Sequence, residues 1–264
     1  MNENDFVVTD LLKKEIEDWE EERKWFQETN AFNFIRQHLD ERLLVVVGNQ
    51  ESIRFLKTEL DSFNNKDGVL RCCSLFLCVI HGGSLNHDKL MDETESEFYR
   101  TLKATFEAFD INQSISRKEV LDNLDTHLNI YLKKKDGQYS VLHHRLLDFL
   151  FYYFGQRYQQ LIINFADSEM IRDRTVLQSL DIIPQEFTIL IDGQNETDYI
   201  QRLVNDMLSD HINDVLYNHQ MIHKDFRSKL VSHLQKLNDD DLTVTYVFSS
   251  IILKQTEKHP KCYL

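Results

Sequence analysis

Residues 129–143, Asn-Ile-Tyr-Leu-Lys-Lys-Lys-Asp-Gly-Gln-Tyr-Ser-Val-Leu-His, decide the fold of the middle of this 264-residue chain. Two runs of alternating character, 129–134 and 138–143, flank the pair Asp136-Gly137. Asp-Gly between such runs is a strong signal for a two-residue turn, in which both residues take positive φ. The stretch therefore predicts a β-hairpin.

Three helical segments precede this hairpin in the sequence. Apolar residues at helical spacing predict helices over 70–80, 95–109 and 117–128, the last with Ser116 as its N-cap. A polar break over 64–68 separates the first of them from the preceding segment. Three helices followed by a hairpin is the element order of a winged-helix module.

The rest of the chain also has mainly helical patterns. Only 7 Gly and 2 Pro occur, while 42% of the residues are hydrophobic, which favours long helices around a core over a sandwich or barrel. Helices are predicted over 11–27, 31–41, 52–63, 146–158, 162–180, 197–208, 211–217 and 224–237. Strands are predicted over 43–47 and 188–192, and 242–253 fits either a helix or a strand.

Charge and apolar content exclude several classes of function. A net charge of −14 argues against a nucleic-acid partner, because binding to phosphate backbones needs a concentrated basic face. No apolar run is long enough to span a bilayer, and residues 1–10 lack the basic and apolar regions of a secretory signal. We therefore expect a cytoplasmic protein with no membrane partner.

Residues 43–63 have the strand–loop–helix order of a phosphate-binding loop. Gly48 occupies the first glycine position of that motif, but Ile53, Arg54 and Phe55 replace its second glycine, lysine and hydroxyl. Glu51 adds a negative charge where backbone N–H groups would cradle phosphate. The sequence predicts a degenerate loop with no ATPase activity.

Residues 22–34, Glu-Arg-Lys-Trp-Phe-Gln-Glu-Thr-Asn-Ala-Phe-Asn-Phe, together with the run that ends at Gly48, resemble the third class of novel STAND NTPases. Residues 137–155 are similar to the winged-helix end of that family, and residues 166–180 are similar to its next segment. The resemblance implies a signal-transduction protein, with a role in innate immunity, whose family members bind ATP or ADP. Here only residues 52–68 separate the loop from the winged helix, so this chain is expected to be a truncated or degenerate member.

His143 is the one nucleotide-contacting position that the resemblance carries over. In related STAND proteins the histidine of a Met-His-Asp motif contacts bound ADP, and Leu142-His143-His144 stands in that place. Leucine replaces the methionine and His144 replaces the aspartate. The residues themselves favour the alternative that His143 packs as a structural histidine.

Two further sets of residues have structural explanations that outweigh functional ones. The first set contains residue types that bind zinc, and it comprises Cys72, Cys73, Cys78, His81 and His87. Side chains of adjacent cysteines point in different directions on a helix, so they do not ligate one ion together. Buried cysteines on an apolar helix pack as small hydrophobic side chains. The second set is basic and comprises Arg117, Lys118, Lys133, Lys134, Lys135 and Arg145. Such residues could contact phosphate, but acidic residues lie between them in the sequence and reduce the local positive charge.

These patterns predict a mainly α chain in four parts. They are an N-terminal helical lead over 1–42, a degenerate P-loop remnant over 43–68, a winged-helix-like domain over 69–158 and a C-terminal helical array over 159–264. The expected function is a non-catalytic signalling or protein-interaction module with no metal and no cofactor. The alternative is a regulatory switch that keeps affinity for ADP or ATP through Gly48, Arg54 and His143.

Overall fold

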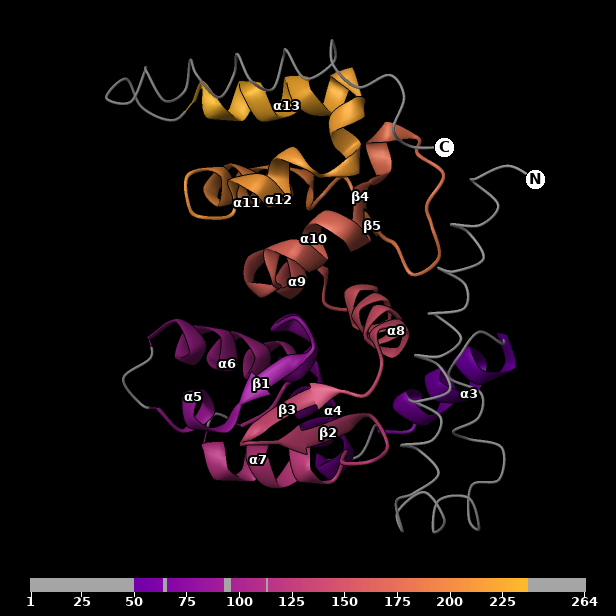
Figure 1. The fold of residues 1–264 in the computed structure, drawn as a ribbon, viewed down its shortest axis with the longest axis vertical. Coiled ribbons are helices and arrows are strands. Elements are labelled where there is room, and N and C mark those ends of the chain that lie inside the picture. The colour runs from indigo at the N-terminus through magenta and orange to yellow at the C-terminus, as the bar shows by residue number, and fades with distance from the viewer. Residues whose placement is uncertain (1–49, 64–65, 93–95, 113, 237–264) are drawn as a thin grey trace, which may run out of the picture. The chain divides into compact units, whose positions relative to one another are not determined.

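The computed structural model describes residues 50–63, 66–92, 96–112 and 114–236, a part of the chain that is mainly helical with two small sheets (Figure 1). The chain divides into two compact units, 1–59 and 60–264, and each is described by itself. Helix α3 (Gln50–Asp61) confirms the helix predicted over 52–63. The predicted helices over 11–27 and 31–41, the strand over 43–47 and the segment 242–253 lie outside the described residues.

The second unit begins with a group of helices around a three-stranded antiparallel sheet. The elements are α4 (Lys66–Ile80), β1 (Ser84–Asn86), α5 (His87–Met91), α6 (Ser96–Ala108), α7 (Arg117–Asp125), β2 (Leu132–Lys135) and β3 (Gln138–Val141). The strand order is β1-β3-β2, so the hairpin gains a third strand that comes before α6 and α7. The three predicted helices and the hairpin are confirmed, whereas β1 and α5 were not predicted. The predicted polar break is wrong from Lys66 onward, where α4 already begins.

The hairpin turn has the backbone geometry that its sequence predicts. Lys135 pairs with Gln138, which leaves Asp136 and Gly137 as a two-residue loop. Their φ angles are 51° and 76°, the positive values that a type I′ turn needs at both positions. Glycine adopts such a φ without steric penalty, and a β-branched residue does not.

Gly137→Val is expected to lower the free energy of unfolding by about 1–3 kcal/mol, because valine is strained at positive φ. Urea denaturation followed by circular dichroism measures the change. Lys133→Val is the matched control, since it places the same side chain at an exposed position of β2. Equal stability of the two variants would contradict this account of the turn.

Helix α7 begins where its capping residues predict. The Ser116 hydroxyl accepts a hydrogen bond from the Glu119 N–H at 3.2 Å, and the Glu119 carboxylate accepts one from the Ser116 N–H at 2.7 Å. This reciprocal pair is a capping box, which satisfies two N–H groups that a helix start otherwise leaves unpaired. The prediction of Ser116 as the N-cap is confirmed.

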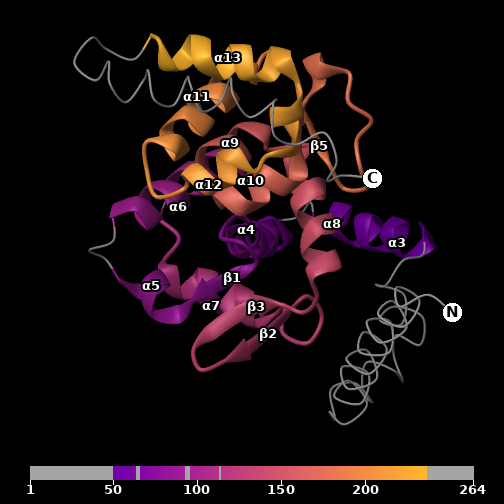
Figure 2. The same cartoon turned by 45° about the horizontal axis from the view of Figure 1, so that its top comes forward.

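Helix α4 is the buried centre of this group, in contact with α6, α7 and α8 (Figure 2). The Phe76 ring lies 5.2 Å from the Phe154 ring, centroid to centroid. The three cysteines of α4 are buried among these side chains. Burial raises the pKa of the Cys72 thiol to about 11, so it stays protonated near neutral pH and packs as a small apolar group.

The chain continues as a helical array with a second, parallel sheet of two strands. Its elements are α8 (His144–Gly155), α9 (Gln159–Phe165), α10 (Ser168–Arg174), β4 (Thr175–Leu177), the 3-10 turn η1 (Gln178–Leu180), β5 (Ile189–Ile191), α11 (Glu196–Met207), α12 (Ile212–Leu216), the 3-10 turn η2 (His219–Ile222) and α13 (Lys224–Leu234). The predicted helices over 146–158, 197–208, 211–217 and 224–237 are confirmed, as is the strand over 188–192. Helix α8 is buried along most of its length, as predicted.

The single helix predicted over 162–180 is wrong. The backbone is extended at Ala166, and the Asp167 carboxylate accepts hydrogen bonds from the N–H groups of Glu169 and Met170. Asp167 therefore starts a new helix, α10. That helix ends at Arg174, because the next three residues pair with β5 as a parallel strand.

A buried glutamine closes the free edge of β4. The Gln220 side-chain oxygen accepts a hydrogen bond from the Leu177 N–H at 2.8 Å, and its amide nitrogen donates to the Thr175 carbonyl at 3.2 Å. The same nitrogen donates to the Tyr199 hydroxyl at 2.8 Å. One side chain thus supplies the bonds that a further strand would make.

The end of α3 is joined to the end of α8. The Tyr153 hydroxyl donates to the Asp61 carboxylate at 2.8 Å, and the Arg157 guanidinium donates to the same oxygen at 2.5 Å. Burial and this hydrogen bond raise the pKa of the Tyr153 hydroxyl, which therefore remains a donor at neutral pH. The contact fixes the C-terminal end of α3, which belongs to the second unit, against the core.

None of the helices in the described ranges combines the length and the apolar content needed to cross a bilayer.

Candidate functional site

A cleft of about 810 Å³ lies between the three-stranded sheet and the helical array. One wall comes from β1, α5 and α6, and includes Ser84, Asn86 and Lys89. The other wall comes from the turn between α9 and α10, from α11 and from the segment after α11. The cleft therefore joins residues that are more than a hundred positions apart in the sequence.

Arg202 of α11 holds the second wall together. Its guanidinium donates to the Asp206 carboxylate at 2.8 Å and to the backbone carbonyls of Ile163 and Ala166 at 2.8 and 2.7 Å. Those carbonyls belong to the last turn and the C-cap of α9, where a helix leaves its acceptors without internal partners. One cation therefore closes the end of α9 and anchors it to α11.

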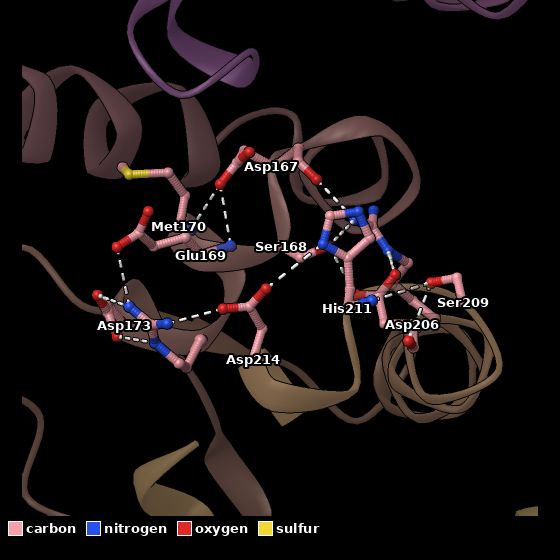
Figure 3. Close-up of polar contacts among 12 residues, drawn as sticks. Asp167, Ser168, Glu169, Met170, Asp173, Asp206, Ser209, His211 and Asp214 are labelled. Carbon is pink, nitrogen blue, oxygen red and sulfur yellow. Dashed lines mark hydrogen bonds and ion pairs between the residues drawn. The ribbon is translucent and has the colours of Figure 1, made fainter. Parts of the chain in front are cut away.

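Asp206 is buried beside Arg202 and is hydrogen-bonded on both oxygens. The Ser168 hydroxyl donates to its second oxygen at 3.1 Å, and both residues are drawn in Figure 3. The side chains of Arg202 and Asp206 are only 16% and 10% exposed, so water does not screen their attraction as it does at the surface. These hydrogen bonds join α11 to the turn between α9 and α10.

A second ion-pair cluster adjoins the cleft at its His211 side. Arg172 donates to Asp214 at 2.7 Å and to Asp173 at 2.6 Å, and the His211 ring lies 3.4 Å from the other oxygen of Asp214 (Figure 3). The hydrogen bond to Asp173, with the neighbouring carboxylates, raises the pKa of the Arg172 guanidinium. The cluster ties α10 to α12.

Ser209 and His211, which both line the cleft, are hydrogen-bonded or paired to different groups. The Ser209 hydroxyl donates to the Asp206 backbone carbonyl at 2.9 Å, while the His211 ring pairs with Asp214, so neither side chain activates the other. Of the charged residues that line the cleft, Lys89 and Asp167 form no ion pair within the described ranges. No group of three or more His, Cys, Asp or Glu side chains there is placed to hold a metal ion.

Of the residues predicted to bind nucleotide, His143 is not among those that line this cleft. Gly48 lies outside the described residues, and Arg54 is exposed on α3, where its carbonyl accepts a hydrogen bond from the Thr58 hydroxyl. His143 is the N-cap of α8, and its Nδ1 accepts a hydrogen bond from the Arg145 N–H at 3.2 Å. Arg54 and His143 belong to different units, so a nucleotide site between them stays a prediction.

Sequence reasoning missed the residues that build the cleft, although two signals for them were present. Asp167-Ser168-Glu169 carries the chemistry of a helix start in the middle of the predicted helix over 162–180. Arg202 and Asp206 stand four positions apart, which places them on one helix face. Neither signal identifies the partner elements, because those come from distant parts of the chain.

Comparisons of the chain with models of protein families, with curated proteins and with solved structures found no match.

Proposed function

We propose that this chain is a non-catalytic, cytoplasmic signalling module that binds other proteins through a winged-helix unit and the helical array behind it. The winged-helix assignment is supported by the order α4, β1, α6, α7, β2, β3, into which the short helix α5 is inserted after β1, and by the strand order β1-β3-β2. In a winged helix the helices and strands follow one another in this order, and the first strand pairs with the last. The resemblance of residues 22–34, 43–48, 137–155 and 166–180 to STAND NTPases supports the signalling context.

The observation that carries the choice of a protein partner is the internal pairing of the basic side chains around α7 and the hairpin. Lys134 donates to the Tyr139 hydroxyl at 2.6 Å and lies 3.2 Å from the Asp125 carboxylate. Arg145 pairs with Glu186 at 2.5 Å. These cations would contact phosphate in a nucleic-acid-binding winged helix, and here they are bonded within the chain.

Arg117 is also bonded within the chain. Its guanidinium donates to the backbone carbonyls of Leu90 and Asp92, which fixes α7 against the end of α5. Three of the six basic residues singled out in the sequence thus have intramolecular partners. On a chain of net charge −14 this pairing disfavours a nucleic acid and favours a protein surface.

The degenerate loop leads us to expect no ATP hydrolysis by the purified full-length chain. Phe55 stands where a hydroxyl would hold magnesium, and the expected phosphate release with magnesium and ATP equals that of a heat-denatured control. Titration calorimetry with ADP and ATP tests the alternative function. Saturable ADP binding that is lost in Arg54→Ala or His143→Ala would replace the proposal with a nucleotide switch.

A photo-crosslinking amino acid at Lys133, introduced into the chain in its native cells, tests the choice of partner. Lys133 is exposed on β2 and lies beside the internally paired cations. The proposal expects covalent adducts with protein. Adducts with nucleic acid, together with salt-sensitive binding of a DNA duplex in a mobility-shift assay, would contradict it.

A further inference from the structure

A second hollow, a groove of about 390 Å³, lies between the end of α5, α6 and the start of α7. Its floor is apolar and includes Leu102, Phe106 and Ile115. Met91 and Tyr99 border it and are 43% and 56% exposed, although large apolar side chains favour burial. An accessible apolar hollow of this kind marks a place where another molecule can bury surface.

The charged residues that line this groove are all basic. They are Lys103 of α6 and Arg117 and Lys118 of α7, and no acidic side chain of the described residues is among the lining groups. Neither Lys103 nor Lys118 forms an ion pair with another described residue. Glu119 lies in the first turn of α7, and its carboxylate accepts a hydrogen bond from the Ser116 N–H. This hydrogen bond lowers the pKa of the Glu119 carboxyl group.

The start of α7 adds to the positive potential of the groove. Ser116, Arg117 and Lys118 are the N-cap and first two residues of this nine-residue helix, where the helix dipole is positive. The three basic lining residues stand out on a chain whose net charge is −14. A ligand that matches the groove therefore has an apolar stripe flanked by carboxylates.

We propose that the groove between α5, α6 and α7 binds an acidic amphipathic helix of a partner protein. Apolar side chains of that helix occupy the floor beside Met91, whose flexible thioether adapts to different shapes. Its carboxylates face Lys103 and Lys118. This inference rests on the proposed function as a protein-binding module and names the chemistry of one partner surface.

A protein segment fits the groove better than an anionic membrane does. The apolar floor is recessed between helices, so a ligand must project side chains into it, which a helix does and a flat headgroup layer does not. Vesicles that contain phosphatidylserine are therefore included as a competing probe.

The test uses three synthetic fluorescent peptides and the full-length chain. The first peptide has Leu and Phe at helical spacing with Glu at the other positions, the second replaces every Glu by Lys, and the third carries a central proline that breaks the helix. Fluorescence anisotropy is expected to show saturable binding of the first peptide, with the other two weaker by about tenfold or more.

Two charge-reversal variants locate the binding site. Lys103→Glu with Lys118→Glu is expected to reduce affinity for the acidic peptide by about tenfold and to improve binding of the lysine peptide. Lys133→Glu with Lys135→Glu changes the net charge equally at exposed hairpin positions outside the groove, and is expected to bind like the parent chain. Tyr99→Ala is expected to weaken binding of the acidic peptide. The melting temperature of the protein is expected to stay unchanged, because Tyr99 is exposed.

Three results would overturn the inference. They are no saturable binding of the acidic peptide, equal effects of the two charge-reversal pairs, and tighter association with phosphatidylserine vesicles than with the peptide. Protein adducts from the crosslinker at Lys133 together with any of these results would leave the proposed function supported and this groove excluded as the site. Nucleic-acid adducts would instead remove the proposed function itself.

Discussion

Arg202→Met is expected to lower the free energy of unfolding by about 3–5 kcal/mol, the range for breaking a buried ion pair on one side. Methionine fills much of the same space but donates no hydrogen bonds. The Asp206 carboxylate then stays buried with only the Ser168 hydroxyl as a donor, and the last carbonyls of α9 lose theirs. Denaturation in guanidinium chloride followed by circular dichroism measures the loss.

Two further variants separate the ion pair from side-chain size. Arg202→Met with Asp206→Leu is expected to recover part of the lost stability, because no unpaired charge remains buried. Arg100→Met makes the same replacement at an exposed position of α6 and is expected to stay within about 0.5 kcal/mol of the parent chain. An Arg202→Met variant as stable as Arg100→Met would mean that the pair does not hold this wall of the cleft.

Mild acid is expected to destabilise the fold through His127. This histidine follows α7 and is buried, with its Nε2 2.9 Å from the Arg71 carbonyl of α4 and its Nδ1 without a hydrogen-bond partner among the described residues. Burial lowers its pKa to about 4, from 6.5 in an exposed histidine. The unfolded chain therefore binds a proton at a higher pH than the folded chain does.

The sign of the effect is set by this difference in proton binding. Stability from neutral His127 is complete above pH 6.5 and is lost as the pH falls toward about 4. The loss amounts to about 3 kcal/mol when the pKa difference is converted at 1.36 kcal/mol per unit. His127→Gln keeps an amide donor for the Arg71 carbonyl but does not titrate. Urea unfolding at several pH values is expected to show a shallower decline for this variant, and equal slopes would contradict the assignment.

The elements that the sequence predicted well are determined by residues close to one another in the sequence. The Asp136-Gly137 turn is fixed by the φ preferences of two residues, and the start of α7 by two side chains three positions apart. The helices around them have a single apolar face or are buried, which periodicity detects. Such features need no knowledge of the rest of the molecule.

The cleft could not be predicted, because its walls form through contacts that are distant in the sequence. Strand β1 has three residues, too few to show a period, and it is defined by pairing with Gln138 and the next two residues of β3. Strand β4 continues the helical pattern of 162–180 in the sequence, but pairing with β5 and with Gln220 overrides that pattern. Hydrogen bonds to distant parts of the chain therefore outweigh the local preference of these residues for a helix.

The hydrogen bonds that join Asp61 to Tyr153 and Arg157 can form only late in the synthesis of the chain. The two contacts span 92 and 96 residues of sequence. At a synthesis rate of about 5–20 residues per second, the ribosome needs on the order of 5–20 s to deliver those partners after Asp61 has been added. During that interval the apolar surface of α4 that α8 later covers has no partner. Nascent chains of this protein are thus expected to need a holding chaperone until α8 has left the exit tunnel.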